Sequence, residues 1–272
     1  MRKNSFLFVV MLFTALSLGF ASCDNDKGND PDDPTTGNDS GKENNHTIVS
    51  TCTDYVDLGL SVKWATCNIG ASSPEKFGCY FAWGETTPKT FYDWSTYKWM
   101  TLGSSDYFGI NKYTIDDYAY IEWGDGEIDD YSNHNVAWYD SNLNFIGDNK
   151  TILDAEDDAA AVNMGGEWRI PTIEEIIELR TKCTWTRTTL NGVKGYNVEG
   201  PNGNSIFLPT AGSRYYSSLY EEGYFGGYWS SSIGHFSERA RILSWYENEW
   251  DDATCEGQYT RDEGLPVRGV LR

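Results

Sequence analysis

The strongest structural signal in the chain is the start of a helix after Thr172. Thr172 and Glu175 have the spacing of a capping box, in which each side chain accepts a hydrogen bond from the other residue's backbone N–H. The isoleucines of the run Ile173–Leu179 then fall on one helical face. A second segment, Asp154–Asn163, has helical spacing and ends at the glycine pair that begins with Gly165. Both predicted helices are short, so other elements must supply most of the core.

Short strands are predicted on both sides of these helices. Apolar and polar residues alternate around Val62–Trp64, and Gly78–Gly84 is a second, aromatic strand candidate. Asn191-Gly192 predicts a tight turn, and Pro201–Asn204 separates two apolar runs as in a hairpin. Further short aromatic strands are expected from residue 228 to the end. Two short helices with many short strands predict an α+β fold with small antiparallel sheets and irregular loops.

The N-terminus has the features of a secretory signal peptide over residues 1–22. Arg2 and Lys3 precede an apolar stretch, Phe6–Phe20, that is too short for a spanning helix. The following Ala21-Ser22-Cys23 resembles a bacterial lipobox, which implies that Cys23 is lipidated. The alternative is an ordinary signal peptide that is cleaved near Ala21.

Residues 24–45 contain seven acidic residues, two lysines and no aromatic residue. Such a segment cannot bury enough surface to offset the entropy of ordering, so 23–45 is predicted to be a lipidated cysteine with a disordered acidic tether. An acidic run at this place also resembles the surface-export signal of Bacteroidetes lipoproteins, with a plain solvated spacer as the alternative. We therefore expect an outer membrane lipoprotein at the cell surface, which contacts the membrane through its lipid anchor only.

Charge and composition exclude several classes of partner and cofactor. The net charge is −20. Residues 1–22 contribute +2 and residues 24–45 contribute −5, so the region 46–272 carries −17. This charge repels phosphate backbones and argues against nucleic acid. The five cysteines after Cys23 include no C-x-x-C pair, and the EF-hand pattern from Asp125 fails at Asp130 and Val136. We therefore predict no metal and no cofactor, while an odd number of cysteines leaves at least one thiol unpaired within the chain.

Five segments together resemble the Fibrobacter succinogenes major paralogous domain family. They are residues 55–71, 81–85, 157–172, 228–232 and 266–270. The resemblance implies a C-type-lectin-like domain over 46–272, more distantly similar to formylglycine-generating enzymes, with an insertion at about 117–142. The thiol pair of those enzymes has no counterpart, because Cys255 is the only cysteine after Cys183.

The aromatic residues divide into a predicted core and a predicted surface. Those inside the family motifs are expected in the core, and they are Trp64, Trp83, Trp168, Tyr228 and Trp229. The stretch 232–265 resembles the variable, ligand-binding part of lectin-like proteins that are diversified by retroelements. The ligand-binding residues predicted there are His235, Phe236, Glu238, Arg239, Arg241, Trp245, Tyr246, Trp250, Tyr259 and Arg261.

These features predict a non-catalytic lectin-like domain that binds an extracellular glycan or protein through its C-terminal loops. Two alternatives remain at this point. One is a carbohydrate-active hydrolase that uses a carboxylate pair. The other is a structural component of the cell envelope with no soluble ligand.

Overall fold

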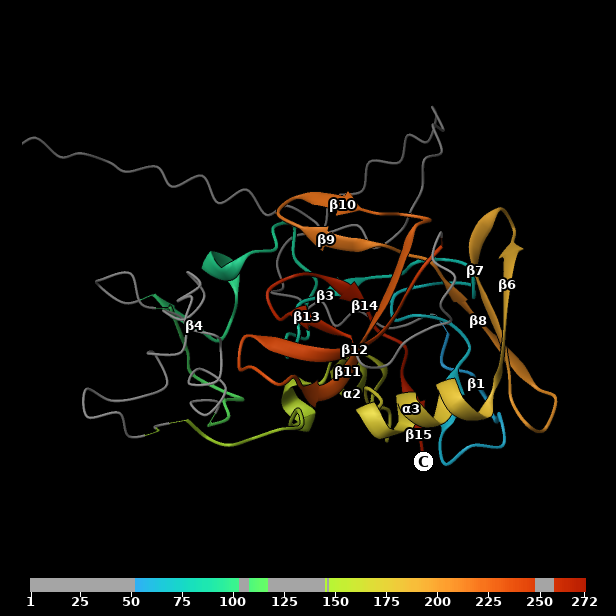
Figure 1. Ribbon diagram of the computed structural model, residues 1–272, viewed down its shortest axis with the longest axis horizontal. Helices are drawn as coiled ribbons and strands as arrows, with labels where there is room; N and C mark the ends of the chain where they lie inside the picture. Colours follow the sequence, from blue (N-terminus) through green and yellow to red (C-terminus); the bar gives the residue numbers. More distant parts are fainter. Residues whose placement is uncertain (1–51, 103–107, 117–144, 146, 248–256) are drawn as a thin grey trace, which may run out of the picture.

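Six small antiparallel sheets and two short helices make up the part of the chain that the structure describes (Figure 1). The structure is a computed structural model, and it describes residues 52–102, 108–116, 145, 147–247 and 257–272. The three-stranded sheets are β1 (Tyr55–Val56), β2 (Lys63–Ala65) and β15 (Val270–Leu271); β6 (Thr184–Leu190), β7 (Val193–Glu199) and β8 (Ser205–Pro209); and β11 (Phe225–Ile233), β12 (Arg239–Tyr246) and β13 (Gln258–Thr260). The two-stranded sheets are β3 (Tyr80–Phe81) with β14 (Leu265–Pro266), β4 (Met100–Leu102) with β5 (Phe108–Ile110), and β9 (Ser213–Tyr215) with β10 (Ser218–Tyr220). The prediction of a mixed fold with few helices and small antiparallel sheets is confirmed for these residues.

The capping box predicted at Thr172 is present at the start of α3 (Ile173–Lys182). The Thr172 Oγ1 accepts a hydrogen bond from the backbone N–H of Glu175, whose carboxylate in turn accepts one from the Thr172 N–H at 2.9 Å. Arg169 donates from both terminal nitrogens to the same carboxylate, which fixes the entry to the helix.

The other predicted helix is divided at Asp158, which corrects the continuous helix expected over 154–163. Residues Ala155–Asp157 form a 3₁₀ turn, and α2 extends only over Ala159–Met164. The Asp158 carboxylate accepts hydrogen bonds from the backbone N–H groups of Ala160, Ala161 and Ile170, so it caps α2 and ends the preceding turn.

The predicted hairpins are confirmed. Asn191 and Gly192, both with positive φ, connect β6 to β7, and β7 pairs with β8 across the turn at 201–204. In the C-terminal part, β11 and β12 form a long hairpin that lies between α2 and β13 in Figure 1. After β13, the short strands expected in this part are Leu265–Pro266, which pairs with β3, and Val270–Leu271, which pairs with β2.

Tryptophans and a buried arginine hold the small sheets together. Trp64, Trp83 and Trp229 are at most 2% exposed, and the other predicted core residues, Trp168 and Tyr228, are also buried. Arg268 is buried and donates hydrogen bonds to the Ala65 and Phe207 carbonyls and to the Asn68 Oδ1, so it joins the C-terminal segment to β2 and β8. Large rings and a satisfied guanidinium thus replace the extended sheet that this fold lacks.

The two ends of the described chain meet in one sheet, because β2 lies between β1 and β15. A disulfide joins Cys52 to Cys67 next to this sheet, and Cys183 is a free thiol. The signal peptide, Cys23, the acidic tether and the predicted insertion at 117–142 lie outside the described residues. Within the residues that the structure describes, no helix is both long enough and apolar enough to cross a membrane.

Candidate functional site

Five of the predicted ligand-binding residues lie together at the turn that joins β11 to β12. They are His235, Phe236, Glu238, Arg239 and Arg241, here called the distal turn surface. His235 is exposed and the other four are partly exposed. The distal turn surface therefore carries an imidazole, a phenyl ring, a carboxylate and two guanidinium groups.

The backbone of the distal turn surface is closely held. The Gly234 N–H donates to the Arg239 carbonyl at 2.8 Å, and the Arg239 N–H donates to the Phe236 carbonyl at 3.0 Å. Ser237 is fully buried, and its hydroxyl accepts a hydrogen bond from the Ile115 N–H at 3.3 Å. Arg241 Nη1 lies 3.1 Å from His235 Nε2. The turn is thus held by backbone hydrogen bonds, whereas the Nε atoms of Arg239 and Arg241 are buried without a hydrogen-bond partner among the described residues.

The structure corrects the prediction for Trp245 and Arg261, which are 2% and 0% exposed and cannot contact a ligand. Trp245 is buried because its ring stacks on Tyr228 and its Nε1 donates to the Thr210 Oγ1 at 3.0 Å. Arg261 is buried because the interior supplies an acceptor for each of its nitrogens, as described below.

Three further predicted residues are not part of the distal turn surface. Tyr246 is at the opposite end of β12, where its ring packs on Phe225 at 5.0 Å. Tyr259 stacks on the same Phe225 ring, and its hydroxyl lies 3.0 Å from the Ser213 Oγ. Trp250 lies outside the described residues.

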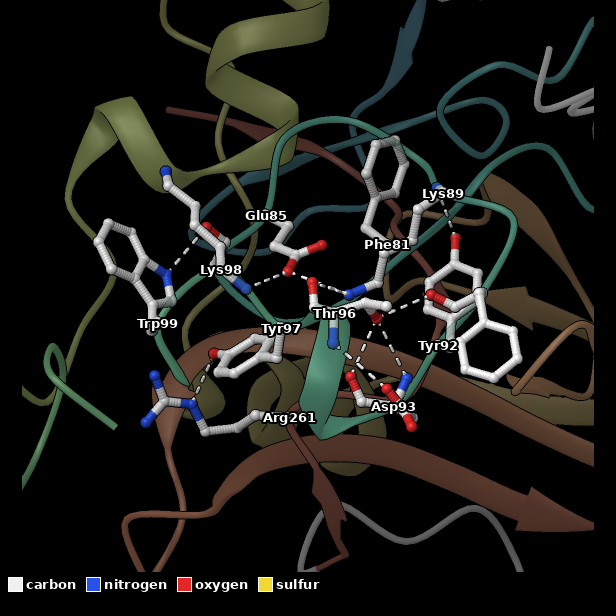
Figure 2. A network of polar contacts seen from close by, with 12 residues as sticks. Phe81, Glu85, Lys89, Tyr92, Asp93, Thr96, Tyr97, Lys98, Trp99 and Arg261 are labelled. Carbon is white, nitrogen blue, oxygen red and sulfur yellow. Dashed lines mark hydrogen bonds and ion pairs between the residues drawn. The ribbon is translucent and has the colours of Figure 1, made fainter. Parts of the chain in front are cut away.

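Arg261 is the centre of a buried polar network, part of which is drawn in Figure 2. Its Nε donates to the Tyr97 hydroxyl at 2.9 Å, Nη1 donates to the Tyr113 and Ser237 carbonyls, and Nη2 donates to the Lys112 carbonyl. The guanidinium carbon also lies 4.6 Å from the centre of the Trp83 ring. The cation is therefore stabilised by oxygen dipoles and a ring face, which joins the residue 83–113 region to the distal turn surface.

The same network fixes the irregular loop 85–99. Figure 2 shows Glu85 directed at the Lys98 backbone, whose N–H donates to its carboxylate at 2.7 Å, while the Lys89 ammonium lies 3.1 Å from that carboxylate. Asp93 caps a short 3₁₀ turn, Trp94–Thr96, in a second capping box. Loop 85–99 thus has a defined conformation although it contains no strand and only one 3₁₀ turn.

Loop 85–99 meets the β9–β10 hairpin through Tyr92 and Tyr216. Each of these residues donates its N–H to the other's carbonyl, at 2.9 and 2.7 Å. The Tyr92 ring is buried, whereas the Tyr216 ring is 42% exposed and lies 5.3 Å from the exposed Phe91 ring. The hairpin is held at its other side by Arg214 and Gly264, which also exchange two hydrogen bonds of 2.8 Å.

The aromatic residues around this contact were not predicted from the sequence. Tyr215, Tyr216 and Tyr220 lie on or next to the hairpin, outside the family motifs and before the stretch 232–265. The available signal was a turn in which tyrosine and serine, rather than glycine or asparagine, separate two strands.

Next to the hairpin, Asp262 and Glu263 form an acidic pair in the turn after β13. Asp262 is 2% exposed, and its Oδ1 has no hydrogen-bond partner. Burial, with a contribution from the charge of Glu263, raises the pKa of Asp262 to about 7, and burial also raises the pKa of Glu263. This carboxyl is enclosed by protein, so it is placed to influence neighbouring groups rather than to contact a substrate.

Asp154, Glu156 and Asp157 are the acidic cluster, within the described ranges, whose geometry could hold a metal ion. The Lys112 ammonium already lies among the three carboxylates, 3.1 Å from Asp154 and 3.3 Å from Glu156. Burial opposes the charge on Lys112, but hydrogen bonds to Asp157 and Asp154 raise its pKa overall. The lysine thus supplies the positive charge that a metal ion would bring, and the cluster serves to hold loop residues together.

Comparisons with models of protein families, with curated proteins and with solved structures give no match.

Proposed function

We propose that this chain is a surface-exposed lipoprotein whose folded region is a non-catalytic, C-type-lectin-like domain that binds an extracellular glycan or protein. The observation that carries the proposal is the distal turn surface, where His235, Phe236 and Arg241 are presented on a turn with satisfied backbone groups. Aromatic and arginine side chains on a pre-ordered turn are typical of binding sites, because little entropy is lost when they engage a ligand.

The lectin-like fold is supported by the burial of residues from the segments that resemble the family. Trp83, Trp168, Trp229 and Arg268 belong to those segments, and all four are buried. The family motifs thus account for the core, while the distal turn surface falls between two of them. This division suits a fixed scaffold with an adaptable binding turn.

The hydrolase alternative gains no support from Asp262, the carboxyl whose pKa is raised to about 7. Asp262 has a pKa that a general acid could use, but a catalytic carboxyl must come within hydrogen-bond reach of its substrate. At 2% exposure, Asp262 does not.

Binding is tested with the full chain on arrays of glycans and of extracellular proteins. The His235→Ala/Arg241→Ala double variant is expected to lower the signal at least tenfold. Arg180→Ala, which removes an arginine from α3, is the matched control and leaves the signal unchanged. A folded wild-type chain that binds nothing on either array contradicts the proposal.

Anchoring is tested separately by labelling cells with a radioactive fatty acid. We expect the label to be incorporated into the wild-type chain and to be absent from Cys23→Ala. Equal labelling of the two chains, or none in either, contradicts lipidation at Cys23.

A further inference from the structure

A second exposed aromatic surface lies away from the distal turn surface, at the β9–β10 hairpin and loop 85–99. We define the tyrosine platform as Phe91, Tyr215, Tyr216 and Tyr220. Phe91, Tyr216 and Tyr220 are 40%, 42% and 46% exposed, which places them among the most exposed large apolar side chains of the described residues. Exposed aromatic groups gathered at one place on a soluble domain mark an interaction site.

The rings of the platform touch one another in a continuous row. The Tyr215 and Tyr216 ring centres are 4.0 Å apart, with Phe91 5.3 Å beyond Tyr216 and Tyr220 6.3 Å beyond Tyr215. A cage for a quaternary ammonium group needs rings that surround an empty centre. The platform rings contact one another and leave no such centre, and neighbouring rings are tilted by 41°, 44° and 55°.

The backbone conformation of Tyr216 indicates that its side chain has a function other than stabilising the fold. Its φ of 51° lies in the left-handed region, which costs an L-residue about 1–2 kcal/mol and costs glycine nothing. A largely exposed ring recovers little of that cost by burial. Unfavourable backbone conformations of this kind are concentrated at functional sites.

The platform is ordered before any ligand arrives. Tyr92 and Gly264 hold the hairpin from two sides through paired backbone hydrogen bonds. A hydrogen bond with Tyr216, together with partial desolvation and nearby charge, raises the pKa of Tyr215 to about 12, so the Tyr215 phenol stays neutral at physiological pH. Binding therefore requires little reorganisation of the protein.

Acidic groups lie next to the β9–β10 hairpin, which carries three of the four platform residues. The charges of Asp262 and Glu263 act on Tyr215, and the Glu221 charge acts on Tyr259 below the hairpin. Glu221 and Glu222 are exposed. Carboxylates accept hydrogen bonds from hydroxyl groups, and they repel anionic ligands.

From these observations we propose that the tyrosine platform binds a neutral glycan. The C–H-rich faces of its pyranose rings would stack on the negative faces of Tyr215, Tyr216 and Phe91. Its hydroxyl groups would donate to the neighbouring carboxylates and exchange hydrogen bonds with the tyrosine hydroxyls. The region 46–272 carries −17, so sialylated or uronic-acid glycans are disfavoured. This inference rests on the proposed binding function, and it names both a ligand class and a second site.

The test uses the full chain on an array of neutral gluco-, manno-, galacto- and xylo-oligosaccharides, with sialylated and uronic-acid oligosaccharides on the same slide. Calorimetric titration with the best neutral oligosaccharide then compares the wild-type chain with Tyr216→Ala and Tyr220→Ala. Tyr55→Ala is the matched control, because Tyr55 is 50% exposed but lies on β1. Thermal unfolding of each variant confirms that it folds.

We expect a neutral oligosaccharide to bind, with at least a tenfold loss of affinity in Tyr216→Ala and Tyr220→Ala and less than a twofold change in Tyr55→Ala. Retention of affinity in both platform variants, with loss in His235→Ala/Arg241→Ala, overturns the platform and leaves the proposed function standing. Binding of acidic glycans alone, or of proteins alone, also overturns the platform but not the binding function. A folded chain that binds neither glycan nor protein overturns both.

Discussion

Tyr92 and Tyr216 face each other across one pair of backbone hydrogen bonds, yet the molecule uses their rings in opposite ways. The Tyr92 ring is 1% exposed, and its hydroxyl donates to the Tyr80 carbonyl at 2.6 Å. The Tyr216 ring is 42% exposed and contacts only other partly exposed rings among the described aromatic pairs. Residue type alone therefore does not tell a core aromatic residue from a surface one in this tyrosine-rich chain. The distinction depends on whether the side chain finds a buried polar partner.

Removal of the Tyr92 side chain is the strongest test of this contrast. We expect Tyr92→Ala to lower the free energy of unfolding by about 3–5 kcal/mol, because it opens a cavity and removes the hydrogen bond to Tyr80. Tyr216→Ala is the matched variant and should cost less than about 1 kcal/mol. Urea denaturation of both chains measures the difference, and similar losses would contradict the division into core and surface.

Arg261 extends the test to the buried network of Figure 2. Arg261→Met keeps an unbranched side chain but leaves the Tyr113, Ser237 and Lys112 carbonyls without this donor. We expect a loss of about 2–4 kcal/mol, since each buried acceptor left unpaired is costly. Arg239→Met, whose side chain is 42% exposed, should change stability by about 0.5 kcal/mol or less. If ligand binding is lost while stability is unchanged, the sequence-based assignment of Arg261 to the binding surface is restored.

Local patterns predicted the elements that depend on local chemistry. The capping box at Thr172 and the turn at Asn191 involve residues within a few positions of each other, so their spacing carries the information. The burial of Arg261 depends on partners more than 140 positions away, at Tyr97 and Lys112. A charged residue in a C-terminal turn is ordinarily exposed, and the pattern around it gave no sign of those distant oxygens.

The exposed platform was missed for a related reason. Tyr215 and Tyr216 belong to a hairpin that the sequence did not mark with glycine or asparagine, and Phe91 comes from a loop far away in the chain. The meeting of the two depends on the Tyr92–Tyr216 bridge, which is a tertiary contact. The five residues of the distal turn surface are neighbours in sequence, so their proximity could be predicted, and their role in binding stays a prediction.

The pH dependence of the free energy of unfolding tests whether the pKa of the buried Asp262 carboxyl is raised. Burial raises the pKa of Asp262 to about 7, so the folded chain keeps a proton that the unfolded chain releases near pH 4. A raised carboxyl pKa makes the folded state bind more protons, and stability therefore falls as pH rises from about 4 to 7. We expect Asp262→Asn to gain roughly 1–3 kcal/mol relative to the wild-type chain over this interval. Denaturation curves at pH 4.5, 6 and 8 measure the gain, and parallel curves for the two chains would show that Asp262 titrates normally.

The smallest expected effect is also the sharpest test of the comparison, because it concerns the backbone at Tyr216. Tyr216→Gly relieves the strain of a φ of 51° but adds chain entropy to the unfolded state and removes the ring contacts with Phe91 and Tyr215. These contributions offset one another, so we expect stability to change by no more than about 0.5 kcal/mol. The control is Gly212→Ala, whose φ of 70° is also left-handed. A Cβ at this position would clash with the Tyr220 carbonyl oxygen, so the loss of stability should exceed about 1 kcal/mol. Thermal unfolding distinguishes the two results. A large loss in Tyr216→Gly would make Tyr216 a structural residue like Tyr92, and the exposed row of rings would then be a by-product of folding rather than a surface kept for a ligand.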